Sequence, residues 1–257
     1  MDMSDAVMRR KPSGMDDTEW EARLELASAY RVFHFLGWTE LIFNHITLRV
    51  PGPERHYLIN PFGLNYSEVT ASNLVKVGLD GVPVAPGSHG INRAGFIIHS
   101  AIHANRDDAH CVMHTHTTAG MAVACKQDGL RGDNFYSAIA VNDLAYHDFE
   151  GITVHEDEQP RLVKSLGDKR MLILRNHGLL SVGQGVPDAF RRMWQLERSC
   201  QVQALSDSMS GASIVLSDTV KKASYNDTMK VGPATGIEKM MYDSVLRNAG
   251  IRVDDLA

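Results

Sequence analysis

The stretch Ala109-His110-Cys111-Val112-Met113-His114-Thr115-His116 decides how the rest of the sequence is interpreted. Its alternation predicts a strand, with Val112 and His114 on one side. Side chains at positions i and i+2 of a strand point to the same face, about 7 Å apart. His114 and His116 could therefore close on one metal ion. The alternative is that two histidines merely flank the end of a strand.

A third histidine strengthens the metal interpretation. Residues 170–175 are predicted to form a second buried strand, which ends at the turn Asn176-His177-Gly178. Strand ends and their loops usually meet at one edge of a sheet, so His177 could join the pair. Three neutral imidazoles with an open position are typical of a catalytic metal site. His99 and His103 lack an H-E-x-x-H pattern, and packing or surface exposure explains them more simply.

The remaining pattern predicts one α/β domain over residues 16–257, after a flexible segment at 1–15. Residues 128–150 are expected to be irregular, and residues 207–235 to form a polar, mobile excursion. Helices and strands interleave around one core, which favours a mixed, layered fold. Strands are expected at 46–50, 57–60, 75–77, 109–116, 170–175 and 179–182, and helices at 18–36, 94–105, 118–126, 160–166, 187–206 and 237–248.

Composition excludes several classes of protein. The 257 residues are 44% apolar and 22% charged, which is typical of a globular domain. The net charge of −5 disfavours nucleic acid and anionic membranes as partners. No apolar run approaches the roughly 20 residues of a membrane span, and the N-terminus lacks the apolar stretch of a signal peptide. Three scattered cysteines indicate a cytoplasmic location.

Several short motifs occur in a fixed order between about residues 18 and 205. With them the chain resembles the class II aldolase/adducin family, and most closely its adducin-head-like branch. The motifs are Gly37-Trp38-Thr39-Glu40-Leu41-Ile42-Phe43-Asn44-His45-Ile46-Thr47, Leu58-Ile59-Asn60-Pro61-Phe62-Gly63-Leu64, Asn92-Arg93-Ala94-Gly95-Phe96, Val112-Met113-His114-Thr115-His116, Ala145-Tyr146-His147-Asp148 and Leu174-Arg175-Asn176-His177-Gly178.

The resemblance implies an α/β/α sandwich around a mostly antiparallel sheet. It also implies a divalent metal held by His114, His116 and His177, which would act as a Lewis acid. Zinc is the usual metal of the family, and manganese or iron would also suit imidazole ligands. Members are commonly homotetramers in which a tyrosine reaches a neighbour's site. Tyr136 is the first candidate for that tyrosine and Tyr146 the second.

Departures from the family pattern bear on the substrate. Sugar-phosphate aldolases of the family carry P-S-S-E where this chain has Asn92-Arg93-Ala94-Gly95, so Gly95 replaces the acid/base glutamate. The two phosphate loops are also altered, and phosphate would lose several hydrogen bonds, which disfavours a phosphorylated ketose. The substrate-binding candidates that remain are Asn44, Thr47, Asn60 and Gly63.

Arg93 is new in this loop. It could bind a carboxylate through two hydrogen bonds, or it could be a surface arginine. In the first case the substrate carries a carboxylate.

Two functions therefore stay open. The first is a metal-dependent lyase that cleaves a carbon–carbon bond, as an aldolase or a decarboxylase, in a small carbonyl or carboxylate compound through a metal-stabilised enolate. The second is a non-catalytic, oligomeric scaffold like an adducin head, which could retain a metal. The intact histidine set favours the lyase, and the replacement by Gly95 favours the scaffold.

Overall fold

The computed structural model describes residues 11–85, 89–152 and 155–257. The segment 1–15, which we predict to be flexible, lies outside the described residues over its first ten positions. In the described ranges no helix is both long and apolar enough to cross a membrane.

The centre of the described structure is a mixed, seven-stranded sheet with the order β3-β2-β1-β4-β7-β6-β5. Every neighbouring pair is antiparallel except β5 and β6, which are parallel. The expected mostly antiparallel sheet is thus confirmed. The strands are β1 His45–Arg49, β2 Tyr57–Ile59, β3 Val75–Val77, β4 Cys111–Thr115, β5 Leu144–His147, β6 Met171–Leu174 and β7 Gly178–Gly183.

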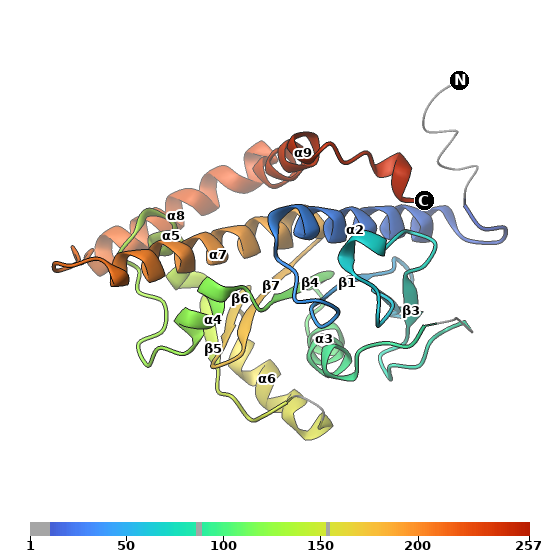
Figure 1. Cartoon of the computed structure of the whole chain (residues 1–257), viewed down its shortest axis with the longest axis horizontal. Helices are drawn as coiled ribbons and strands as arrows, with labels where there is room; N and C mark the ends of the chain where they lie inside the picture. Colours follow the sequence, from blue (N-terminus) through green and yellow to red (C-terminus); the bar gives the residue numbers. More distant parts are fainter. Residues whose placement is uncertain (1–10, 86–88, 153–154) are drawn as a thin grey trace.

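Helices cover both faces of the sheet (Figure 1). The long helices α2 and α7 lie on one face, with α9 packed outside them, while α3 and α6 lie on the other. Helix α8 packs against α5 near one end of α7. The α helices are α2 Asp17–Leu36, α3 Arg93–Asn105, α4 Thr118–Ala124, α5 Phe135–Ala140, α6 Gln159–Leu166, α7 Val186–Ser208, α8 Asp218–Thr235 and α9 Ile237–Ala249, and the 3-10 turns are η1 Tyr66–Glu68, η2 Val141–Asp143, η3 Glu156–Glu158 and η4 Val253–Leu256.

Alternation along the central strands sorts side chains between two cores. Ile46 and Met113 belong to the core beneath α2 and α7. Val112 belongs to the core beneath α3 and α6, and the hydroxyl of Thr47 also faces α3. Because the period of a strand is two residues, His114 shares the face of Val112. The sheet thus directs the functional candidates of β1 and β4 toward α3.

The prediction of irregular structure is wrong for two segments. Residues 128–150 contain α5 and β5, and residues 207–235 contain α8. Helix α5 is only six residues long, too short to show a helical period, and the Asn134 side chain caps it by accepting from the amides of Tyr136 and Ser137. Helix α8 is polar and largely exposed, so it lacks the apolar stripe from which helices are predicted.

Candidate metal centre

Three histidines meet where β4 ends and β7 begins, at one end of these inner strands of the sheet. His114 lies in β4 and His116 just beyond it, while His177 lies in the tight turn that joins β6 to β7. Strands β4 and β7 pair with Thr115 opposite Leu179, which brings the end of β4 beside the start of β7. One ring nitrogen from each histidine lies within 4.8 Å of the others. We call His114, His116 and His177 the histidine cluster.

Backbone geometry at the turn makes this approach possible. Asn176 adopts a left-handed conformation with φ of 56°. A Cβ atom on Gly178 would lie 2.3 Å from the carbonyl oxygen of Thr115 and 3.0 Å from the His116 ring. Glycine at residue 178 therefore lets β7 approach β4 closely enough to complete the cluster.

Hydrogen bonding prepares the cluster to bind a metal. His114 donates from Nδ1 to the carbonyl oxygen of Leu179 at 2.9 Å, which leaves a lone pair on Nε2. That Nε2 lies 2.7 Å from Nε2 of His116. Burial, followed by the neighbouring histidines, lowers the pKa of His114 well below its usual value, and burial lowers the pKa of His177 to about 4. Neutral, converging imidazoles fit a divalent transition metal.

His45 is a neighbour of the cluster that the sequence did not single out. It stands directly opposite His114 across β1 and β4, and the two rings stack with centroids 5.1 Å apart. A Cβ atom on Gly95 would lie 2.4 Å from Cδ2 of His45. The imidazole of His45 therefore occupies the space that a side chain at residue 95 would need.

His45 begins a buried hydrogen-bonded series that we call the histidine chain: His45, His99, Thr47 and His103. Nδ1 of His45 lies 2.9 Å from Nε2 of His99, and Nδ1 of His99 lies 2.7 Å from Oγ1 of Thr47. Oγ1 of Thr47 lies 2.8 Å from Nε2 of His103, whose Nδ1 lies 3.0 Å from the carbonyl oxygen of Ala109. All four side chains are buried.

The histidine chain is electrically neutral at neutral pH. Burial is the main cause that lowers the pKa of His45 and of His103 to about 3, and burial also lowers the pKa of His99 well below its usual value. His99 and His103 are thus packed residues, as the simpler interpretation had it, but they are also fully hydrogen-bonded. The signal in the sequence was the combination of His45 and Thr47 on one face of a strand with His99 and His103 one helical turn apart.

The predicted substrate-binding residues differ in whether their polar atoms are already hydrogen-bonded within the protein. Thr47 is completely buried with its hydroxyl inside the histidine chain. Asn60 is 3% exposed, and its side-chain oxygen lies 3.0 Å from the Tyr30 hydroxyl. Asn44 is 2% exposed, and its Oδ1 has no hydrogen-bond partner among the described residues. Asn44 therefore keeps a free acceptor, whereas Thr47 and Asn60 are engaged within the protein.

Gly63 and Arg93 lie at more open positions. Gly63 has φ of +98° in the turn after β2, a conformation that favours glycine. The side chain of Arg93 is 61% exposed, and its guanidinium pairs with Glu156 at 2.7 Å. A substrate carboxylate would have to displace Glu156, and exposed ion pairs of this kind are weak enough to exchange partners.

The two candidate tyrosines are also engaged by the protein. The ring of Tyr136 packs edge-to-face on Trp194 at 5.4 Å. The hydroxyl of Tyr146 accepts a hydrogen bond from the amide of Leu130 at 2.9 Å, and Arg175 lies over its ring. Burial raises the pKa of Tyr146. Within this chain, then, Tyr136 has a ring-packing contact, and the hydroxyl of Tyr146 is hydrogen-bonded.

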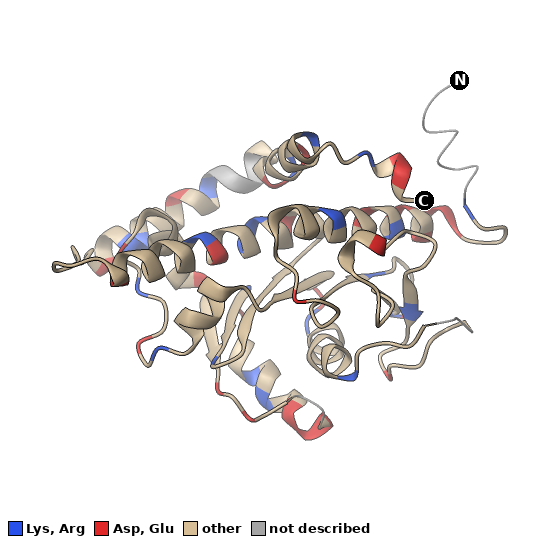
Figure 2. Cartoon of the chain, viewed as in Figure 1, with Lys and Arg blue, Asp and Glu red and all other residues tan. Residues whose placement is uncertain are grey.

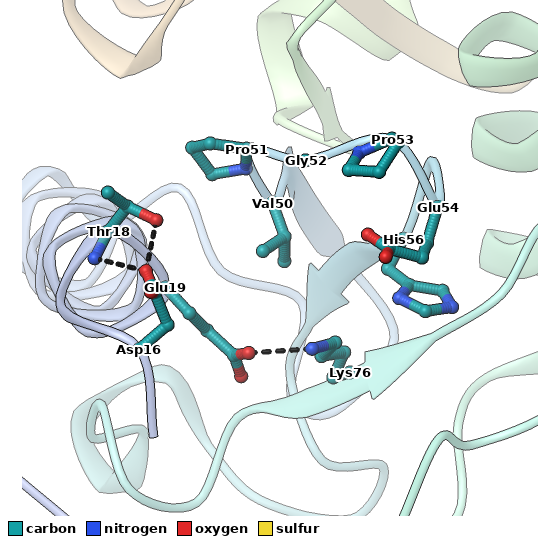
Figure 3. Close-up of a pocket in the computed structure, with 10 residues that line it drawn as sticks. All are labelled: Asp16, Thr18, Glu19, Val50, Pro51, Gly52, Pro53, Glu54, His56 and Lys76. Atoms are coloured by element: carbon teal, nitrogen blue, oxygen red, sulfur yellow. Dashed lines mark hydrogen bonds and ion pairs between the residues drawn. The ribbon is translucent and has the colours of Figure 1, made fainter. Parts of the chain in front are cut away.

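A separate cavity of about 430 Å³ opens at the far end of β1 from His45 (Figure 3). Val50 follows β1 there, and the Lys76 ammonium pairs with Glu19 at 2.6 Å. Asp16 and Glu54 also line this cavity, so its lining is acidic on balance despite that ion pair. Figure 2 shows acidic and basic residues scattered over the described helices and loops.

Comparisons with known proteins agree with this architecture. Residues 24–204 match the family described as Class II Aldolase and Adducin N-terminal domain. Alpha-adducin of Mus musculus is 47% identical over 211 residues, which cover 80% of this chain but only 29% of that protein.

Solved structures extend the comparison to almost the whole chain. An aldolase II superfamily protein from Pseudomonas syringae has a TM-score of 0.86 at 42% identity, with 91% of this chain and 94% of that chain covered. L-fuculose 1-phosphate aldolase from Glaciozyma antarctica PI12 has a TM-score of 0.80 at 26% identity, with 97% and 98% covered. The chain belongs to the class II aldolase and adducin family.

Proposed function

We propose that this protein is a divalent-metal-dependent lyase that cleaves a carbon–carbon bond in a small carbonyl or carboxylate compound. The observation that supports the proposal is the convergence of His114, His116 and His177, with one nitrogen of each within 4.8 Å of the others. Zinc is the first choice of metal, and manganese or iron would suit the same ligands. When bound, the ion would supply a Lewis acid that stabilises negative charge developing on a substrate oxygen.

The side chains around the cluster restrict the type of lyase reaction. No carboxylate can act from residue 95, because this residue is glycine and His45 fills the adjacent space. Loss of carbon dioxide from a keto acid or a hydroxylated aromatic acid produces a carbanion without proton abstraction from carbon. Such a decarboxylation is therefore compatible with Gly95. Arg93 could orient the substrate carboxylate if it exchanges Glu156 for the substrate.

A second candidate function is an oligomeric scaffold without catalysis. It is supported by the 47% identity to alpha-adducin and by the absence of the family's acidic residue at position 95. This chain covers less than a third of alpha-adducin, so the properties of that whole protein do not transfer to it. In this alternative, the histidine cluster would bind a metal without turnover.

Elemental analysis tests whether the cluster binds a metal. We expect about one divalent transition metal per purified chain, and less than a tenth of that in the His114→Ala/His116→Ala variant, because His177 alone cannot hold the ion. His110→Ala is the matched control, since His110 is exposed and precedes β4. It should keep the metal content of the wild type.

The two functions are then separated by turnover. Carbon dioxide release or aldol cleavage by the metal-loaded chain, lost in the double variant, would support the lyase. Absence of metal from the wild type, even after incubation with zinc or manganese, would contradict the lyase and leave the scaffold as the better proposal.

A further inference from the structure

The histidine chain connects the histidine cluster to a backbone carbonyl in the short link between α3 and β4. It starts at His45, whose ring stacks on His114, and ends at the carbonyl oxygen of Ala109 just before β4. Its four internal contacts are between 2.7 and 3.0 Å long. Its rings are buried and none of them is hydrogen-bonded to a carboxylate among the described residues, so each carries one proton on one of its two nitrogens.

The carbonyl at the end of the chain fixes every proton in it. A carbonyl oxygen only accepts, so Nδ1 of His103 must carry its proton and Nε2 must accept. The Thr47 hydroxyl then donates to His103, and it must accept from Nδ1 of His99. Because the single proton of His99 is on Nδ1, its Nε2 carries none and accepts a hydrogen bond from Nδ1 of His45. The last free position, Nε2 of His45, is therefore a hydrogen-bond acceptor.

We propose that the histidine chain holds Nε2 of His45 as a fixed acceptor beside the histidine cluster, and that His45 thereby selects carbonyl substrates with a hydroxyl group on the adjacent carbon. His99, Thr47 and His103 are positioning residues in this arrangement. The inference rests on the proposed function, because the substrate must be held at the histidine cluster.

The position of His45 favours contact with substrate over a purely internal role. A Cβ atom on Gly95 would lie 2.7 Å from Nε2 of His45, so this nitrogen lies beside the residue where the family's sugar-phosphate aldolases carry their glutamate. The side chain is only 3% exposed, and Nε2 makes no hydrogen bond among the described residues. An acceptor that no protein group satisfies favours a ligand that can donate to it, by about the value of one hydrogen bond.

Thr47 offers a nearly isosteric way to break the chain. Thr47→Val removes the hydroxyl, so the proton of His99 is no longer confined to Nδ1. Nε2 of His45 is then no longer held without a proton. Thr47→Ser keeps the hydroxyl and is the matched control. His45→Phe retains a ring against His114 but removes the acceptor, and it does not depend on the interior of the chain.

The experiment is a calorimetric titration of the zinc-loaded full-length protein with acetohydroxamate and glycolohydroxamate. Both probes chelate metals through the same group, and they differ by one hydroxyl. We expect wild type and Thr47→Ser to bind glycolohydroxamate about 3- to 10-fold more tightly, the value of one hydrogen bond. Thr47→Val and His45→Phe should bind the two probes equally, with unchanged zinc content and unchanged affinity for acetohydroxamate.

Each other outcome has a definite meaning. A wild type that binds zinc without preferring the hydroxylated probe overturns the inference and leaves the proposed function intact. An undiminished preference in His45→Phe also overturns it, and this variant decides the question if Thr47→Val does not fold. A wild type that binds no zinc contradicts the proposed function and the inference together.

Discussion

The absence of a side chain at residue 95 gives the imidazole of His45 its place beside His114. A Cβ atom there would lie 2.4 Å from the His45 ring. We expect Gly95→Ala to lower the free energy of unfolding by about 1–3 kcal/mol, the usual cost of overpacking, although alanine is the better helix former. Urea denaturation measures this change.

A double-mutant cycle assigns the cost to the right contact. In a His45→Ala background the ring is gone, so Gly95→Ala should be neutral or stabilising by up to about 1 kcal/mol. The same penalty in both backgrounds would show that His45 is not the obstacle at residue 95.

Burial of neutral histidines makes stability depend on pH. Burial lowers the pKa of His103 to about 3, against about 6.5 for an unfolded histidine. The unfolded chain therefore takes up a proton below pH 6.5 that the folded chain refuses until about pH 3. The stability contributed by neutral His103 is fully present above pH 6.5 and is lost progressively as the pH falls toward 3.

His103→Gln removes this titration while its amide can still donate to Ala109 and accept from Thr47. Between pH 7 and pH 5 we expect the variant to lose about 2 kcal/mol less stability than the wild type. Parallel urea denaturations at the two pH values give the comparison. Equal losses would mean that His103 is already protonated in the folded protein at pH 5.

At the scale of elements, the pairing of β4 with β7 assembles the histidine cluster. Gly178 sits at this contact, where a Cβ atom would be 2.3 Å from the Thr115 carbonyl oxygen. We expect Gly178→Ala to separate the two strands, to lower the free energy of unfolding by about 1–3 kcal/mol and to weaken zinc binding by about 10- to 100-fold. Chemical denaturation and competition with a zinc-chelating dye measure the two effects.

Gly185→Ala is the control for this substitution. Gly185 has an extended backbone, and a Cβ atom added there would lie 3.8 Å from Oε1 of Glu25, an ordinary contact. Its zinc affinity should equal that of the wild type. A Gly178→Ala variant with wild-type zinc affinity would contradict the importance of the close approach.

At the scale of the whole molecule, the exposed apolar surface favours self-association. A groove of about 590 Å³ runs between α5, α7 and the two last helices, and its lining is mostly apolar. Phe135 at its rim is 76% exposed, and Tyr136 and Trp194 also line it. Exposed apolar patches on folded proteins usually mark interaction sites.

We propose that the groove is part of an interface between copies of this chain, and the resemblance to the family predicts a homotetramer. Light scattering after size exclusion should give four times the chain mass of 28.4 kDa. Phe135→Glu places a charge on the exposed rim and should lower the measured mass if the groove is part of an interface. A wild type that runs at 28.4 kDa would contradict the proposal.

Local sequence patterns were sufficient for most of the elements. The helices 94–105 and 237–248 match α3 and α9 to within a residue, and the strand at 109–116 matches β4 with longer ends. The segments that escaped prediction are α5, β5 and α8. Short capped helices, four-residue edge strands and polar helices depend on neighbours distant in the sequence, as Asp133 binding Lys221 beside α5 illustrates.

The sequence by itself determined the family, the α/β class and the candidate set His114, His116 and His177, because periodicity and motif spacing are local properties. Only the tertiary structure decided that Gly95 faces His45, that Thr47 is buried in the histidine chain and that Arg93 pairs with Glu156. These relationships join residues of separate elements. They arise from strand register and helix packing, which no local pattern encodes.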